Sequence, residues 1–431
     1  MRTKQNLLAF LFLLIGVSAH AQNQKIQDKA DYLCHTLLNQ KDFDYPKHFS
    51  PEFIAKIPEG YMKSIVSDLV GAMGFCATTE WLQGNEKTAK YKFVSPTLRY
   101  VTLDFSISDS NLIDGLMFRG LEFPDVVINS WQDVLTYSKS LEGRTAVSIQ
   151  NFSKTRQDGK DELAIQPIGS GFKLYVLGEL ADQVKSGKLN WQQNFPIKAE
   201  WKSLPSGVMQ DWENGKEVSL KTFADYMIMF SDNTATDHLM NILGRSEVES
   251  QLSLMKNSFE SRNRPFLTTA EMFKIKWASP LELIDSFIFG DEAAKRKVLE
   301  NEIAATPLEM VGSNGVSMET PSFIQEIEWF ASTNDLCQGM KSLKEKNSPE
   351  ILDSLSKNVP NLTLGQDSAW AYGGYKGGSE PGVITMTYLL RHKNSEWGCV
   401  SLAWHNEKQV VNTFVFSDFV GKVLKLAEGY F

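Results

Sequence analysis

The residues best suited to chemistry form the sequence Ser170-Gly171-Phe172-Lys173, an S-x-x-K motif at the predicted start of a helix. A spacing of three residues places the serine hydroxyl and the lysine amine on one helix face, within reach of each other. Serine needs a base to act as a nucleophile. A buried lysine loses hydration, so its pKa falls and its neutral form accepts a proton. The helix N-terminus adds partial positive charge where an oxyanion would develop.

The same spacing recurs at Ser253–Lys256 and Ser354–Lys357, so S-x-x-K alone also fits an N-cap or a solvated helix face. Two further motifs follow the first one. Ser231-Asp232-Asn233 lies in a predicted turn between helices, and Lys376-Gly377-Gly378 precedes a predicted strand. The order S-x-x-K, S-D-N, K-[TS]-G is typical of class A β-lactamases and penicillin-binding proteins.

The segments around these motifs strengthen the resemblance. Residues 169–180 read GSGFKLYVLGEL and residues 230–237 read FSDNTATD, and both resemble class A enzymes nearly residue for residue. The resemblance covers residues 143–431. It implies an α/β (α+β) fold of the serine β-lactamase-like type, with an antiparallel sheet flanked by helices beside a helical lobe.

Carried over position by position, the resemblance implies that Ser170 is the acylated nucleophile and Lys173 the general base. Ser231 is implied to relay a proton to the leaving nitrogen or oxygen. Lys376 is implied to supply positive potential for a substrate carboxylate and to help tune Lys173. These four residues are the expected catalytic set.

The expected substrate-binding set is Asn233, Gly378 and Ser379. Asn233 is implied to contact both Lys173 and the substrate, and the backbone N–H groups of Ser170 and Ser379 are implied to form the oxyanion hole. The chain departs from the family pattern at Gly377, which replaces a hydroxyl residue that would bind a substrate carboxylate. We hypothesise that Ser379 compensates for that loss.

A second departure concerns hydrolysis of the acyl-enzyme. Class A enzymes use a glutamate in an E-x-x-L-N loop after the S-D-N helix, and the corresponding stretch, 258–268, lacks that motif. Glu260 is the nearest glutamate, with Asn263 after it, but a surface position also explains Glu260. We therefore expect slow deacylation or another route.

Residues 24–130 are predicted to form a small α+β domain in which two helices precede a meander of strands. The helices are expected at 26–38 and 58–73, the strands at 88–94, 98–107 and 111–118, with a turn at Asp114-Gly115. Asp104 and Asp114 are interpreted as strand-edge and turn residues. The domain is similar to the nuclear-transport-factor-2-like (NTF2-like) or steroid-isomerase-like domain that precedes a β-lactamase-like domain in one family, which includes a protein of clavulanic acid gene clusters.

Three further stretches resemble that two-domain family: residues 264–269 (RPFLTT), 327–332 (IEWFAS) and 375–382 (YKGGSEPG). Within them, Trp329 and Phe330 are interpreted as core residues. Residues 131–143 are predicted to be a helical linker, and residues 144–431 the hydrolase domain. Its expected strands are 145–152, 162–166, 383–390, 399–404 and 409–416, and its expected helices are 170–184, 220–230, 234–243 and 418–427. Strands at both ends predict one sheet closed by the terminal segments.

The first 21 residues have the pattern of a signal peptide. Arg2 and Lys4 precede an apolar run too short to span a bilayer, and Ala19-His20-Ala21 fits a cleavage site before Gln22. We therefore expect a periplasmic or secreted protein without stable membrane insertion. Export permits disulfides, and the four cysteines allow three connectivities. Pairing of Cys34 with Cys76 and of Cys337 with Cys399 is the simplest, and four free thiols are the alternative.

Composition excludes other classes of function. The net charge of −8 and the lack of a long basic run argue against a nucleic-acid-binding protein. The histidines are not at ligand spacing and no C-x-x-C pair occurs, so we expect neither a metal nor a cofactor.

The expected function is an exported serine hydrolase that acts on a small-molecule β-lactam, ester or related amide. A penicillin-binding D,D-peptidase and a non-catalytic ligand-binding or sensor protein on the same fold are the alternatives. Because Ser170, Lys173, Ser231, Asn233 and Lys376 are all present, the sequence favours an enzyme.

Overall fold

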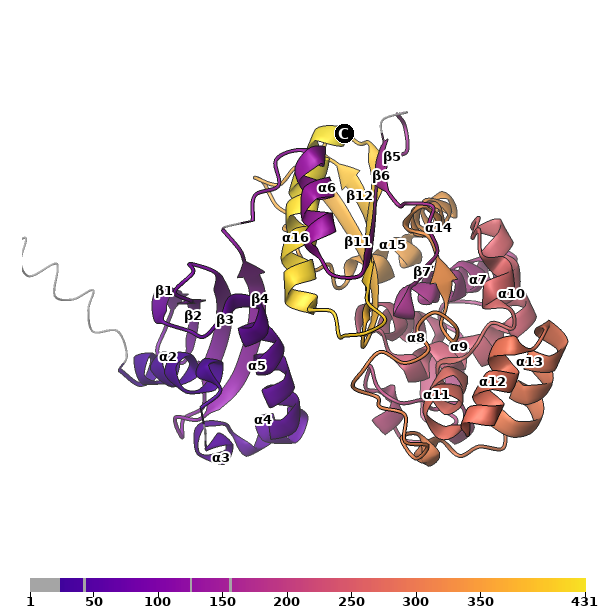
Figure 1. The fold of residues 1–431 in the computed structure, drawn as a ribbon, viewed down its shortest axis with the longest axis horizontal. Coiled ribbons are helices and arrows are strands. Elements are labelled where there is room, and N and C mark those ends of the chain that lie inside the picture. Colours follow the sequence, from indigo (N-terminus) through magenta and orange to yellow (C-terminus); the bar gives the residue numbers. More distant parts are fainter. Residues whose placement is uncertain (1–23, 42–43, 125, 155–156) are drawn as a thin grey trace, which may run out of the picture. The chain divides into compact units, whose positions relative to one another are not determined.

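The computed structural model describes residues 24–41, 44–124, 126–154 and 157–431. The predicted signal peptide lies outside these residues. The chain forms two compact units. The first contains the chain up to Val127 together with Asn412–Phe419, and the second contains Ile128–Val411 and Val420–Phe431 (Figure 1).

The first unit is a four-stranded antiparallel sheet in the order β1-β2-β3-β4, with helices packed on it. Alternate residues of β2 and β3 are buried, so one face of the sheet carries the core against the helices. A disulfide between Cys34 and Cys76 crosses this core. The elements are α2 (Gln24–His35), α3 (Tyr45–His48), α4 (Pro51–Lys56), α5 (Glu59–Met73), β1 (Thr78–Gly84), β2 (Thr88–Val94), β3 (Tyr100–Ile107) and β4 (Ile113–Glu122).

Three features of the first unit differ from the sequence prediction. β1 was not predicted, because its residues do not alternate between polar and apolar. Asp114 and Gly115 lie inside β4 instead of in a turn, and the Asp114 carboxylate accepts a hydrogen bond from the hydroxyl of Ser106 on β3. The turn lies earlier, where the amide of Asn111 donates to the carbonyl of Ser108. Asp104, interpreted as a strand-edge residue, instead lies inside β3, an inner strand of the sheet, 2.6 Å from Arg119.

The second unit contains a five-stranded antiparallel sheet in the order β11-β12-β13-β5-β6. Its strands are β5 (Arg144–Asn151), β6 (Gln157–Lys160), β11 (Trp370–Glu380), β12 (Val383–His392) and β13 (Trp397–His405). The pairing of β13 with β5 joins the end of the chain to the start of this unit. The prediction of one sheet closed by terminal segments is therefore confirmed.

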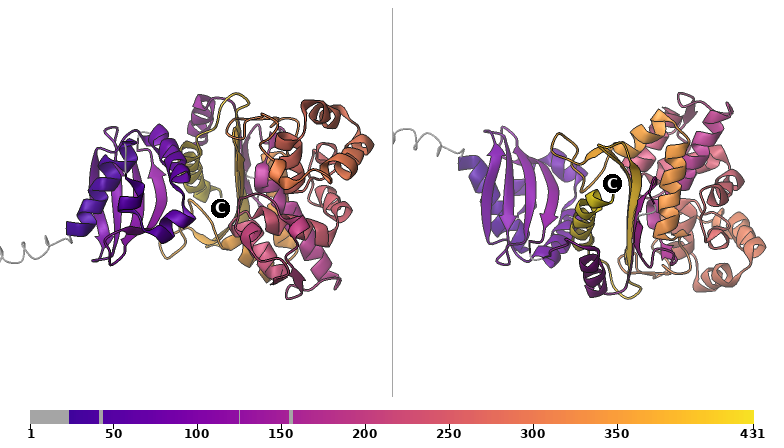
Figure 2. Two further views of the ribbon diagram at one scale, coloured as in Figure 1. Left: turned by 90° about the horizontal axis from the view of Figure 1, so that it is seen from below. Right: turned by 90° about the horizontal axis from the view of Figure 1, so that it is seen from above.

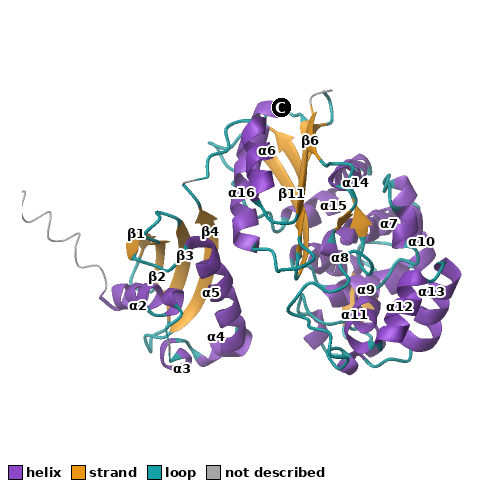
Figure 3. Cartoon of the chain, in the orientation of Figure 1, coloured by secondary structure: helices purple, strands orange, loops and turns teal. Residues whose placement is uncertain are grey.

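Helices cover both faces of this sheet (Figure 2). α6 (Trp131–Ser140) and residues 420–427 of α16 lie on one face, and α14 (Thr333–Glu345) and α15 (Pro349–Ser356) lie on the other. Beyond α14 and α15 is a lobe made almost entirely of helices (Figure 3). It contains α7 (Lys173–Lys185), α8 (Leu220–Met229), α9 (Asn233–Leu243), α10 (Arg245–Leu254), α11 (Thr269–Ala278), α12 (Leu281–Phe289) and α13 (Glu292–Val298).

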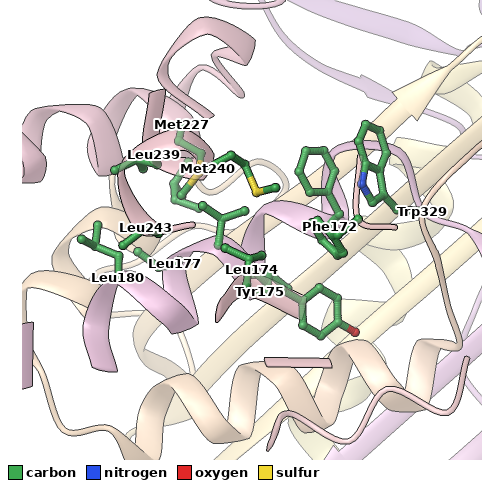
Figure 4. Packing of buried hydrophobic residues seen from close by; sticks show 14 of the residues in the cluster. Phe172, Leu174, Tyr175, Leu177, Leu180, Met227, Leu239, Met240, Leu243 and Trp329 are labelled. Atoms are coloured by element: carbon green, nitrogen blue, oxygen red, sulfur yellow. The ribbon is translucent and has the colours of Figure 1, made fainter. Parts of the chain in front are cut away.

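α7 is the central helix of this unit. Leu174, Leu177 and Leu180 pack against the helices of the lobe, as Figure 4 shows, and belong to one large buried core. At its N-terminal end, the ring of Phe172 stacks on Trp329 with ring centroids 3.8 Å apart. A helix buried on nearly every side gives the residues at its start a fixed position.

Two predicted strands of the second unit are wrong. Residues 412–416 begin α16 (Thr413–Ala427), because the side-chain oxygen of Asn412 accepts hydrogen bonds from the amides of Phe414 and Val415, as a helix N-cap does. Residues 162–166 are not a strand over their length. One edge strand is β6, in the polar sequence between the two expected strands 145–152 and 162–166. The short strand β7 (Gln166–Pro167) pairs with β10 (Phe330–Ala331). An edge strand tolerates polar residues on its exposed side.

The two disulfides generate a prediction about stability. Cys337 on α14 and Cys399 on β13 are both fully buried and form a disulfide that joins the helical layer to the sheet. We expect the double variant Cys337→Ala/Cys399→Ala to lose about 2–4 kcal/mol of unfolding free energy in the second unit. Denaturant unfolding monitored by tryptophan fluorescence measures this loss. An unchanged midpoint would contradict it, and Cys34→Ala/Cys76→Ala is the matched control for the first unit.

Candidate active site

Ser170 lies in a short 3-10 turn, Gly169–Phe172, immediately before α7. The turn is held from two sides, since the amide of Ile168 donates to the carbonyl of Trp329 and the hydroxyl of Thr385 donates to the carbonyl of Ile168. The Ser170 residue is partly exposed, and its hydroxyl makes no hydrogen bond to another described residue. It is therefore both fixed at its backbone and accessible at its side chain.

Lys173 is the first residue of α7 and is fully buried. Its amine donates to the carbonyl of Ser231 at 2.6 Å, to the hydroxyl of Ser231 at 3.2 Å and to the side-chain oxygen of Asn233 at 2.7 Å. Burial lowers the pKa of Lys173 well below its usual value, and the positive charge of Lys376 lowers it further. The carboxylates of Asp237 and Asp232 oppose these effects. This lysine has the environment that a neutral base requires.

Ser231 lies between two lysines. Its hydroxyl oxygen is 3.0 Å from the amine of Lys376 on β11, in addition to its contact with Lys173. Burial lowers the pKa of Lys376 to about 7. The backbone of Ser231 is in the left-handed region, with φ of +55°, which turns its side chain toward both amines. The sequence thus predicted three side chains that the structure brings into direct contact.

The other residues of the S-D-N motif anchor this turn. Asp232 is the N-cap of α9 and accepts from the amide of Ala235, and its second oxygen accepts from the amides of Val208 and Met209. Asn233 donates to the carbonyl of Leu204. Asp232 was not among the predicted site residues, although its place inside the motif is a signal that could have identified it.

Gly378 and Gly169 bring two backbone segments into close contact. A β-carbon at Gly378 would lie only 2.5 Å from the amide nitrogen of Ser170, and one at Gly169 would lie 2.9 Å from the amide nitrogen of Ser379. Only glycine permits this approach, which places the two amides predicted as oxyanion donors on neighbouring strands of backbone. Gly169 also has φ of +46°, a conformation that glycine adopts without strain.

The missing hydroxyl at Gly377 has a structural explanation. A β-carbon at this position would overlap the phenol oxygen of Tyr375, two residues earlier on the same side of β11. Tyr375 therefore places a hydroxyl where the family's serine or threonine would stand. Ser379, the residue hypothesised to compensate, is exposed at the end of the strand. The role of Ser379 stays a prediction, and Tyr375 was not among the predicted site residues.

The two other S-x-x-K pairs are in different environments. Ser253 is exposed on α10, and Lys256 is exposed beyond its end. Ser354 is buried and donates to Asp225, while hydrogen bonds from Lys357 to Asp353 raise the pKa of that lysine. A charged, paired lysine is a poor base. Of the three pairs, only the one at Ser170 combines an accessible serine with a buried lysine of lowered pKa.

Glu260, the weak candidate for deacylation, lies in a 3-10 turn at Glu260–Asn263. Its carboxylate is 3.4 Å from Arg264, which also lies 3.6 Å from Glu249. Within the described ranges, no hydrogen bond or ion pair links Glu260 to Ser170, Lys173 or Ser231.

Over those same ranges, no group of three or more histidine, cysteine or acidic side chains is arranged to hold a metal ion.

The close packing at Gly378 generates a prediction. In Gly378→Ala, the new methyl group meets backbone atoms of Ser170 and Gly171, which cannot rotate away as a side chain does. Because a displacement of about 1 Å costs about 100-fold in rate, we expect labelling of Ser170 by a fluorophosphonate to slow by about that factor. Gly429→Ala is the control, since nothing lies within 4 Å of its added β-carbon. Equal labelling of both variants would contradict the prediction.

Residues 128–366 match the family model described as "Beta-lactamase2: Beta-lactamase enzyme family", a match to more than half of the chain that includes Ser170, Lys173, Ser231 and Asn233. No curated protein matches the chain.

Among solved structures, the chain is similar to a β-lactamase from Sphaerobacter thermophilus (16% identity, 70% of this chain and 99% of that chain, TM-score 0.49). It is also similar to a β-lactamase from Chitinophaga pinensis (15%, 69% and 98%, TM-score 0.47) and to the protein PBP-A (15%, 71% and 98%, TM-score 0.46). On the family match, the chain belongs to the β-lactamase enzyme family, and its mixed α/β architecture with an antiparallel sheet is the fold expected from the motifs.

Proposed function

We propose that the protein is an exported active-site serine hydrolase that forms an acyl-enzyme on Ser170 with a β-lactam, an ester or a related amide. The observation that carries this proposal is the environment of Lys173. Its amine is fully buried, and a second buried lysine further lowers its pKa, one turn from a serine whose hydroxyl is open. Membership of the β-lactamase enzyme family supports the same reaction class.

In the acylation step, the oxygen of Ser170 bonds to the substrate carbonyl carbon and its proton passes to the neutral amine of Lys173. The carbon–nitrogen bond of a lactam or amide, or the carbon–oxygen bond of an ester, then breaks. The hydroxyl of Ser231 donates its proton to the departing atom and recovers one from Lys173, to which it is hydrogen-bonded. The step leaves Lys173 neutral and the acyl group on Ser170.

Charge that develops on the carbonyl oxygen needs donors, and we assign this role to the amides of Ser170 and Ser379. Asn233 holds the amine of Lys173 and forms part of the substrate-binding surface. Lys376 supplies positive charge for a substrate carboxylate, and the hydroxyl of Tyr375 offers a further donor beside Gly377. A ligand with a carboxylate near its reactive carbonyl fits this arrangement.

We propose that deacylation is slow. The position predicted for a water-activating glutamate is taken by Glu260, whose carboxylate is paired with Arg264. Among the described residues, no hydrogen bond or ion pair connects this carboxylate to Ser170, Lys173 or Ser231. The acyl-enzyme therefore accumulates instead of turning over rapidly.

The signal-peptide pattern of residues 1–21 supports export, and the two disulfides are typical of an oxidising compartment. Among the described residues, no helix is both long and apolar enough to cross a bilayer. For the first unit we propose an NTF2-like or steroid-isomerase-like domain. Its sheet and helices support this, as does a cavity of about 560 Å³ lined by both apolar and polar residues, among them Lys90, Asp104 and Arg119.

Intact-protein mass spectrometry tests the nucleophile. We expect a penicillin, a cephalosporin and a fluorophosphonate each to add one adduct to the wild-type protein. Ser170→Ala should form none, and Lys173→Ala should react at most at a trace rate, because the base assigned to accept the proton of Ser170 is removed. An adduct on Ser170→Ala formed at the wild-type rate would contradict the assignment of Ser170 as the nucleophile.

Ser253→Ala is the matched control, since it removes the serine of another S-x-x-K pair that is exposed on α10. It should acylate like the wild type. A lasting β-lactam adduct supports slow deacylation, whereas rapid release of hydrolysed product would contradict it. If no reagent forms an adduct, the proposed function is wrong and a binding protein on this fold is the better description.

The pKa of Lys376 generates a prediction about pH. Because burial lowers this pKa to about 7, the ammonium form is present below pH 7 and is lost as pH rises through that value. The second-order acylation rate of a carboxylate-bearing penicillin, divided by that of an uncharged ester, should therefore fall as pH rises through about 7. Stopped-flow measurements on both substrates give the ratio, which cancels effects common to both. A ratio independent of pH would show that Lys376 does not bind the carboxylate.

A further inference from the structure

Three ionisable side chains, two of them buried and one nearly so, meet beside the turn that carries Ser170. They come from distant parts of the sequence: Lys276 from α11, Glu328 from the segment before β10, and Glu380 from the end of β11. Lys276 is fully buried, and its amine donates to both carboxylate oxygens of Glu380, at 2.7 and 2.8 Å. The proposed acylation step assigns none of these residues a role.

Glu328 connects this ion pair to the nucleophile. One of its oxygens, Oε2, accepts hydrogen bonds from the amide of Gly169 at 3.0 Å and from the amide of Trp329 at 2.9 Å. Gly169 directly precedes Ser170. Since the carbonyl of Trp329 also accepts from the amide of Ile168, both the side chain of Glu328 and the backbone of the next residue hold the turn.

The second oxygen of Glu328, Oε1, is buried and has no partner among the described residues while both carboxyl groups are ionised. Burial raises the pKa of Glu380 overall, while Lys276 and a side-chain hydrogen bond with Glu328 lower it. Two carboxylates cannot form a hydrogen bond, because neither has a proton to donate. The contact is satisfied only when one of the two groups is protonated.

The position of Lys276 decides which group carries the proton. Its ammonium occupies both oxygens of Glu380, which keeps that carboxylate ionised, so the proton belongs on Oε1 of Glu328. The cluster then consists of one cation, one anion and one neutral acid, with no net charge in a buried site. Every oxygen of Glu328 has a partner in this arrangement.

The charges around Glu328 agree with this assignment. Burial raises the pKa of Glu328 to about 8, and the negative charge of Glu380 on β11 acts in the same direction. Lys276 on α11 and the two amide donors lower it. These are the groups that shift the pKa of Glu328, and the charged residues Arg262, Arg264, Lys295 and Glu326 line a pocket together with it.

We propose that Glu328 is a positioning residue that stays protonated in the resting protein and ties the turn of Ser170 to the end of β11. Its protonated oxygen donates to Glu380, the residue after Ser379, and its other oxygen holds the amide before Ser170. The link therefore sets the spacing of the two amides assigned to the oxyanion hole. This inference rests on the proposed acylation at Ser170, but the protonation of Glu328 is testable without any substrate.

The sign of the pH effect follows from the protonated form. Below about pH 8 Glu328 keeps its proton and both hydrogen bonds. As pH rises through that value the proton is lost, and the two carboxylates repel each other. The turn is then held less firmly, and acylation slows even for an uncharged substrate that does not depend on Lys376.

The first test is infrared spectroscopy of the protein without ligand. We expect a carbonyl stretch of a protonated carboxylic acid at neutral pH, which disappears at alkaline pH and is weaker in Glu328→Gln, where Asp237, whose pKa burial raises to about 7, still contributes. The control Glu247→Gln changes an exposed glutamate on α10 and should leave the band in place. A band of equal strength in the wild-type protein and in Glu328→Gln would overturn the proposal whether or not the protein acylates.

The second test is the rate of labelling by an uncharged fluorophosphonate from acidic to alkaline pH. Glutamine reproduces both hydrogen bonds of the protonated acid, since its NH₂ group donates to Glu380 and its carbonyl accepts from the two amides. We expect Glu328→Gln to label near the wild-type rate but without the decline above about pH 8. Glu328→Ala leaves the amide of Gly169 unpaired and should label about 100-fold more slowly at every pH.

The two tests separate this inference from the proposed function. If the wild-type protein shows a stronger acid band than Glu328→Gln but forms no adduct, the protonated state of Glu328 is supported and acylation at Ser170 is wrong. If Glu328→Gln labels as slowly as Glu328→Ala, or keeps the alkaline decline, the positioning role is wrong. Because Glu328→Gln preserves the buried contacts, its labelling rate still tests the positioning role if Glu328→Ala does not fold.

Discussion

Burial of the Lys173 amine is the constraint on which the candidate active site depends. An amine with no access to water must find its hydrogen-bond acceptors in the protein, and here all three come from the S-D-N turn. That turn exists because Ser231 adopts a left-handed backbone and Asp232 anchors both the following helix and the loop at Val208. Each residue of the motif therefore has its own structural task, and all three tasks serve the environment of one amine.

A second lysine makes this arrangement costly and chemically useful. The amines of Lys376 and Lys173 both contact the hydroxyl of Ser231, so two lysine side chains are buried close to each other. Neither the burial nor the repulsion stabilises the fold, and both favour the neutral amine that a base requires. The surrounding core compensates for this cost, because α7 is packed into a large apolar cluster and the rings of Phe172 and Trp329 stack at its start.

The sequence predicted those parts of the molecule whose residue types are dictated by local chemistry. Ser170, Lys173, Ser231 and Lys376 have motif spacings, and the main strands and helices have clear periodicity. Prediction failed where a single side chain determines whether the backbone is helical or extended. Asn412, for example, caps the start of α16 where a strand was expected. It also failed for contacts between distant residues, since Lys276 and Glu380 are 104 positions apart and belong to no local pattern. The sequence also did not predict that Asn412–Phe419, near the end of the chain, belongs to the first unit, since this too depends on contacts between distant residues.

The difference between local motifs and long-range contacts also explains the residues beside the nucleophile, where glycine allows close approach of the backbone and glutamic acid holds it in place. Gly169 and Gly378 allow two backbone segments to approach until their amides are neighbours, but a glycine has no side chain with which to hold another segment in place. Precision at that point has to come from groups that bind the backbone itself. Thr385 holds the carbonyl of Ile168, and Glu328 holds the amide of Gly169. A motif search identifies the glycines, because they are adjacent to the reacting residues. It does not identify the side chains that fix them, because any buried acceptor or donor at the right distance would serve, and only the folded chain shows which residues those are.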